Sequence, residues 1–79
     1  MERNEIFERL NSVFRDVFDD SSITVTGSTT APDIEGWDSL THITLLSAVE
    51  DEFDISFNMK DVVKMKNVGD MADIIQKEA

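Results

Sequence analysis

The sequence contains no cysteine, and among its 79 residues it has one proline, one histidine and one tryptophan. Without cysteine the chain can form neither a disulfide nor a thiolate metal site. This composition suits a reducing compartment, and we expect a cytoplasmic protein. No apolar run approaches the ~20 residues of a spanning helix, so we expect no membrane insertion. Residues 1–5 lack the basic start and apolar block of a secretory signal peptide.

Basic residues are also scarce. Seven lysines and arginines stand against 17 acidic residues, which gives a net charge of −10. Such a surface repels phosphate backbones, so we do not expect nucleic-acid binding. The charge favours partner proteins with basic patches, through steering of their association. Solubility alone would also account for it, and both interpretations stay open.

The hydrophobic pattern predicts an all-α protein with one small core. Apolar residues recur at spacings of three and four in residues 4–18, 39–53, 59–65 and 68–77, which predicts four helices with a short third one. Residues 19–37 have the composition of a long loop. The residues expected to face inward are Leu40, Ile43, Leu46, Val49 and Phe53 in the second helix, Val62, Val63 and Met65 in the third, and Ile23, Val25, Ile34 and Trp37 in the loop.

The segment 36–43, which reads GWDSLTHI, joins the loop to the second helix. Asp38 is a good N-cap, because its carboxylate can accept the free amide hydrogens of the next turn. Ser39 then opens the helix, where free amides and the positive end of the dipole favour an anion.

At Asp38-Ser39-Leu40 the sequence resembles the acyl carrier protein family. The resemblance includes the length, the acidity, the long first loop, the serine opening the second helix, and the ending Glu50-Asp51-Glu52-Phe53. It implies a free-standing, monomeric carrier, with residues 1–79 forming a single acyl-carrier domain and a four-helix bundle. A phosphopantetheinyl transferase would move 4′-phosphopantetheine from coenzyme A to Ser39, beside Asp38 and Leu40. The thiol of that arm would carry acyl groups as thioesters in fatty acid, polyketide or related biosynthesis.

The same resemblance implies partner enzymes of the acyltransferase, ketosynthase or ligase type with basic docking patches. The residues expected to dock them are Trp37, Ile43, Thr44, Glu50 and Asp51. Those expected to line an acyl chain in the core are Leu46, Val62 and Ile75. Met59, Met65 and Met71 fall at helical spacing and are interpreted as adaptable core that could also contact cargo.

The charge pattern departs from that of fatty-acid carriers in the third helix. Lys60 and Lys64 in that helix and Lys66 in the turn after it stand beside one acid, Asp61. In the second helix, Thr41 and Thr44 stand where acids are typical. We therefore expect a specialised carrier for a dedicated pathway.

Two other functions compete with the carrier interpretation. Ser39 could be a nucleophile activated by His42, three residues on, but no G-x-S-x-G elbow surrounds it, and we expect no catalytic residue. His42 is interpreted instead as an exposed residue that either lines the path of the arm or is simply solvated. The acids at residues 50–54 lack EF-hand spacing, so we expect no metal site.

The chain could also be a small acidic interaction module without a prosthetic group.

Overall fold

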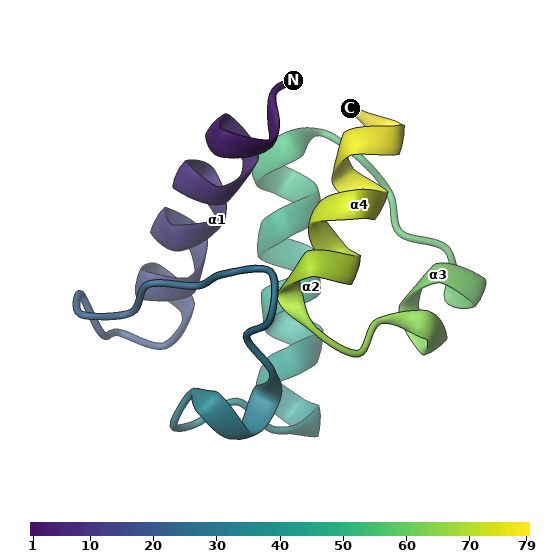
Figure 1. Cartoon of the computed structure of the whole chain (residues 1–79). Coiled ribbons are helices and arrows are strands. Elements are labelled where there is room, and N and C mark those ends of the chain that lie inside the picture. Colours follow the sequence, from purple (N-terminus) through teal and green to yellow (C-terminus); the bar gives the residue numbers. More distant parts are fainter.

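The computed structural model describes all residues, 1–79, and has the predicted four helices with a short third one. The helices are α1 (Arg3–Val17), α2 (Ser39–Phe53), α3 (Met59–Lys64) and α4 (Val68–Glu78), with one 3-10 turn, η1 (Ala31–Asp33), in the long loop. Figure 1 shows α1, α2 and α4 gathered around one core, with α3 standing to the side of α4. No helix is long and apolar enough to cross a membrane.

The core consists of one stripe from each long helix together with three loop residues. In each helix the buried residues recur at spacings of three and four, which places them on one face. The fully or almost fully buried residues are Ile6, Leu10, Val13 and Phe14 of α1, Leu45, Val49 and Phe53 of α2, and Val68, Met71, Ala72 and Ile75 of α4.

The inward face of α2 differs from the predicted stripe. Leu40 and Ile43 are 77% and 67% exposed, so the prediction that they face the core is wrong. The buried residues Leu45, Val49 and Phe53 follow one another at four-residue steps. His42 and Thr41, three and four residues before Leu45, continue this face, and both are half-buried. The first turns of α2 therefore turn His42 inward and leave Leu40 and Ile43 to solvent.

Helix α3 also differs from expectation. Val63 and Met59 are 73% and 75% exposed, which corrects the inward placement predicted for both. They lie four residues apart and so share one face of α3, which points to solvent. Only the opposite face of this six-residue helix packs against the protein. Val62 and Met65 are half-buried on that other side, as predicted.

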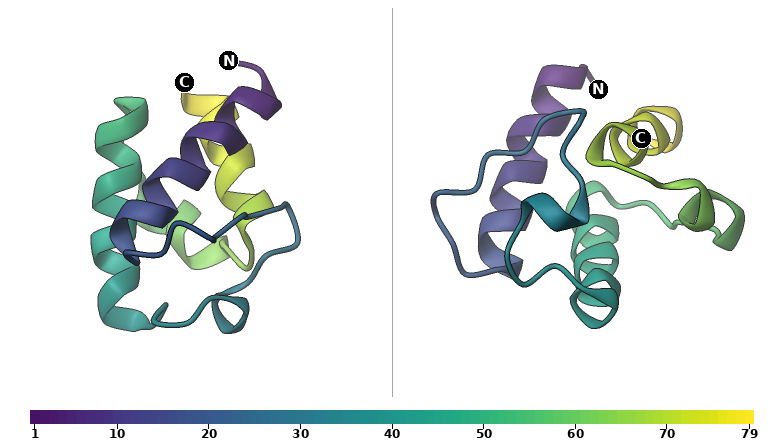
Figure 2. Two further views of the ribbon diagram at one scale, coloured as in Figure 1. Left: turned by 90° about the vertical axis from the view of Figure 1, so that its left-hand side faces the viewer. Right: turned by 60° about the horizontal axis from the view of Figure 1, so that its bottom comes forward.

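The long first loop is held in place at both its apolar and its polar groups. Ile23, Val25 and Ile34 are buried, which confirms them as anchors. Figure 2 shows the loop crossing in front of α1 and reaching the start of α4 before it turns toward α2.

At that point the loop caps α4. The amides of Val68 and Gly69 donate to the carbonyls of Thr29 and Gly27, at 2.8 and 3.0 Å. These amides have no acceptor within the helix, so the loop satisfies donors that would otherwise be free. The contact is close, because a Cβ at Gly69 would lie 2.5 Å from the Gly27 oxygen.

Substitution of Gly69 tests this contact. Gly69→Ala should destabilise the fold by about 1–3 kcal/mol, although alanine is the better helix former, because the loop must move away. The midpoint of thermal unfolding should then fall by roughly 4–8 °C for each kcal/mol. Gly27→Ala is the matched control, because its Cβ would meet only the Gly69 Cα, at 3.9 Å. Equal midpoints for Gly69→Ala and the control would show that the close contact does not hold the loop.

Candidate functional site

The start of α2 is closed by a reciprocal cap. The Asp38 carboxylate accepts hydrogen bonds from the amides of Leu40 and Thr41, at 2.9 and 3.0 Å. The Thr41 hydroxyl accepts from the Asp38 amide at 2.8 Å and donates to the Gly36 carbonyl at 2.7 Å. Gly36 has a φ of 89°, a left-handed conformation that glycine adopts freely and that turns the chain into the cap. Thr41, which departs from the family's usual acid, is thus part of a capping box.

These hydrogen bonds also set the charge at the helix start. They lower the pKa of the Asp38 carboxyl from its ordinary value of 3.8, chiefly through the Thr41 amide and next through the Leu40 amide. Asp38 is therefore ionised at neutral pH and already supplies the negative group that a helix start favours.

Ser39 is the residue that the cap leaves free. It is exposed, and neither its hydroxyl nor its backbone amide has a partner in the protein. A hydroxyl without a partner is available for modification, and the amide beside it remains to donate to an anion there. Ser39 therefore fits a covalently attached phosphodiester, although Asp38 has taken up the two neighbouring amides.

His42 is joined to Trp37 and not to Ser39. The indole Nε1–H of Trp37 donates to His42 Nδ1 at 3.0 Å, and the two rings stack with centroids 5.9 Å apart. Because Nδ1 is the acceptor, the neutral imidazole carries its proton on Nε2. Burial lowers the pKa of His42 and so favours this neutral form.

This arrangement changes the interpretation of His42. The residue is half-buried, so the expectation of an exposed position is wrong. It makes no hydrogen bond with Ser39, and no carboxylate bonds to its ring, so the orienting group of a catalytic dyad is missing.

Trp37 anchors the loop to the core. Its ring packs edge-on against Phe14, with centroids 5.3 Å apart, and lies 6.2 Å from the ring of Phe18. The indole is half-buried, which confirms its predicted place on the core. The indole N–H donates to His42 and so has the hydrogen-bond partner that an indole packed on the core requires.

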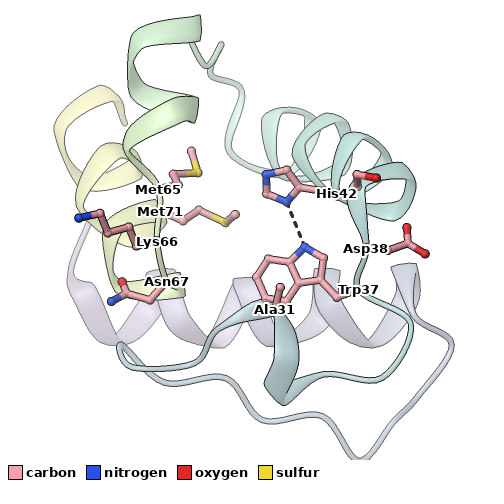
Figure 3. A pocket seen from close by; sticks show the side chains of 9 residues that line it. Ala31, Trp37, Asp38, His42, Met65, Lys66, Asn67 and Met71 are labelled. Atoms are coloured by element: carbon pink, nitrogen blue, oxygen red, sulfur yellow. Dashed lines mark hydrogen bonds between the residues drawn. The ribbon is translucent and has the colours of Figure 1, made fainter.

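A cavity of about 310 Å³ opens beside Ser39. Figure 3 shows it between Trp37 and His42 on one side and Met65 and Met71 on the other. Its lining comes from the loop, the first turn of α2, the connection before α4, and α4 itself. The lining residues are Ala31, Trp37, Asp38, Ser39, His42, Met65, Lys66, Asn67 and Met71.

None of the residues expected to line an acyl chain borders a cavity. Ile75 is fully buried in the core, and Leu46 and Val62 are half-buried. Met65, at the end of α3, and Met71, in α4, line the cavity beside Ser39 instead. His42 joins them in the lining. The sequence pattern does not indicate that its side chain turns inward, because this direction depends on the stripe that α2 buries.

The acids at the end of α2 have separate roles. The Glu50 carboxylate accepts from the Phe57 amide at 2.7 Å and so holds the connection to α3. Glu52 accepts from Arg9 Nε at 2.7 Å, which ties α2 to α1. Asp51 is exposed and makes no hydrogen bond or ion pair. Of the residues predicted to dock partners, Ile43, Thr44 and Asp51 are exposed, whereas Glu50 and Trp37 also serve the fold.

Comparison with known proteins places the chain beside a sequence family and a solved structure. Residues 8–75 match the sequence model of the family described as "Phosphopantetheine attachment site". The fold is similar to the solution NMR structure of a holo acyl carrier protein from Geobacter metallireducens, with a TM-score of 0.86 and 44% sequence identity. That similarity covers 91% of this chain and 83% of the other.

Titration of Asp38 gives a test of the cap. Asp38→Asn keeps a capping side chain without the charge, and Asp38→Ala removes both. Because the pKa of Asp38 is lower in the folded state, the stability it contributes is present above pH 3.8 and is lost as the pH falls through that lowered value. Wild type should therefore unfold at a higher temperature than Asp38→Asn at pH 7, and the difference should vanish in strong acid.

Asp38→Ala should unfold several degrees below both at neutral pH. Asp20, whose pKa is also lowered, titrates in all three proteins, so the difference between them reports Asp38. A difference that persists unchanged to low pH would contradict a role for the Asp38 charge.

Proposed function

Because the chain belongs to the acyl carrier protein family, we propose that Ser39 is the residue to which its 4′-phosphopantetheine arm is attached. Membership makes the chain a non-catalytic carrier that works with a phosphopantetheinyl transferase and with biosynthetic enzymes. The observation that supports Ser39 is its hydroxyl, which is exposed and unpartnered at the capped start of α2.

The attachment is a phosphoryl transfer. The Ser39 oxygen forms a new bond to phosphorus, the pyrophosphate bond of coenzyme A breaks, adenosine bisphosphate leaves, and the hydroxyl proton passes to the transferase or to water. The arm supplies a thiol that holds acyl groups as thioesters. Asp38 and Thr41 hold the first turn of α2 so that Ser39 remains at its rim.

The same proposal covers the surface that meets the partners. Ile43 and Thr44 are exposed near Ser39, and Asp51 supplies a free carboxylate further along α2 for a basic patch. Lys60 and Lys64, on α3, give the neighbouring surface the opposite sign, which favours partners of a dedicated polyketide, modified-lipid or amino-acyl pathway. We place the carrier in the cytoplasm, where thiols stay reduced. Shelter of an acyl chain by Leu46, Val62 and Ile75 stays a prediction that requires the core to open.

Intact mass tests the attachment residue. Wild type incubated with coenzyme A and a broad-specificity phosphopantetheinyl transferase should gain the mass of one phosphopantetheinyl group. Ser39→Ala should gain nothing, because the accepting oxygen is gone. Ser47→Ala, which changes another exposed serine of α2, should load like wild type. Loading of Ser39→Ala would refute the assignment.

The docking role of Asp51 can be tested through the rate of that loading. Asp51→Lys should lower kcat/KM for the transferase by up to about 5-fold, and by less at high salt, because an exposed ion pair contributes little and is screened. Glu8→Lys makes the same charge change on an exposed acid of α1 and should have no such effect. Equal rates for the two variants would show that only net charge matters. Glu50 is unsuited to this test, because its carboxylate holds the Phe57 amide.

A further inference from the structure

We propose that the cavity beside Ser39 holds the part of the arm nearest its phosphate, and that His42 orients it by donating its Nε2–H to an amide carbonyl of the arm. The inference rests on the attachment at Ser39 proposed above. His42 is then a positioning residue, and the arm lies against the protein when no enzyme is docked.

The position of the cavity favours the part of the arm nearest the phosphate as its occupant. Ser39 and Asp38 are themselves part of its wall, so a group joined to Ser39 begins at its rim. Tethering raises the effective concentration of the nearest part of the arm most, because the entropy cost of closing a chain grows with its length. That part consists of a geminal dimethyl group, a hydroxyl and then an amide.

The apolar lining matches the dimethyl group. Met65 and Met71 face the Trp37 ring across the cavity in Figure 3, and Ala31 lies beside the ring. Methionine side chains adapt their shape to small branched groups, and an aromatic face offers a flat apolar wall. Burial of two methyl groups there would favour a folded-back arm without any specific polar contact.

One polar group in this wall has a fixed direction. The Trp37 indole holds His42 Nδ1 as an acceptor, which leaves the proton on Nε2. Nε2 has no acceptor in the protein, and in Figure 3 it points toward Met65. No unpartnered side-chain nitrogen or oxygen is buried in the protein, so Nε2 is accessible to a group that enters the cavity. The first amide carbonyl of the arm can accept from it there in place of water.

The size of the cavity argues against acyl cargo as its resident. At about 310 Å³ it is at the lower end of the ~300–1,000 Å³ range of ligand pockets. Met71 in its wall is 1% exposed, and the core residues Leu45, Val49 and Ile75 are fully buried and do not line it. The cavity can hold one segment of the arm. An acyl group at the far end of the arm could enter only by displacing the segment nearest the phosphate.

The test is an NMR measurement on the protein loaded with the bare arm, after intact mass has shown complete loading. The two methyl groups of the arm should give nuclear Overhauser effects to the Trp37 indole and the Met65 methyl group. Trp37 is the only tryptophan, so its indole signals are unambiguous. His42→Ala should reduce the ratio of bound to free arm about 5-fold, the effect of losing one hydrogen bond. His42→Gln should restore part of it through its amide donor, and Ser47→Ala, on the exposed side of α2, should behave as wild type.

The possible failures are distinguishable. No gain of mass would overturn the attachment and the inference with it. Complete loading without these Overhauser effects would overturn the inference alone. Effects that arise only after acylation, and then from cargo protons, would assign the cavity to cargo and also overturn the inference. A bound population unchanged in a folded His42→Ala protein would remove His42 from the role.

Discussion

The hydrogen bonds between the Asp38 carboxylate and the first amides of α2 determine most of what the site can do. They start the helix at a fixed residue, and with Thr41 they bind the incoming chain at Gly36. Because Asp38 takes the amides of Leu40 and Thr41, Ser39 needs no role in capping. A serine that capped the helix itself would have its oxygen engaged by an amide. The cap therefore separates the structural task from the task of carrying the arm.

The long loop completes the site from the other side. It reaches α4 through the contact between Gly27 and Gly69 and returns to α2 with Trp37 set against Phe14. Trp37 in turn fixes the tautomer of His42 through one hydrogen bond. The loop thus contributes to the stability of α4 and to the chemistry of the cavity, and a change far from Ser39 can alter the surface against which the arm lies.

The helices, the cap and the candidate serine could be predicted from the sequence because each rests on local rules. Periodicity marks the helices, and Asp38 followed by Ser39 marks a helix start. The direction of individual side chains could not be predicted where it depends on the neighbours of a helix. The run from Leu40 to Phe53 is apolar on several sides, so its pattern does not say which side is buried.

Hydrogen bonds between polar side chains and residues outside their own helix could not be predicted from the sequence for the same reason. Glu50 and Glu52 read as a charged helix end, but one holds the Phe57 amide and the other holds Arg9. Only their partners, 7 residues away for Glu50 and 43 residues away for Glu52, separate them from the free Asp51. The cavity between the loop and α4 likewise depends on how segments distant in sequence meet.

The central claim is that the cap leaves the Ser39 oxygen as the one that receives the arm. The most direct test is fragmentation mass spectrometry of the loaded protein, which locates the modification among the hydroxyl residues of α2. The account predicts that the phosphopantetheinyl group is on Ser39 alone, with Thr41, Thr44 and Ser47 unmodified. Modification at Thr41, whose hydroxyl bonds to Gly36, or at any other hydroxyl in place of Ser39, would contradict it.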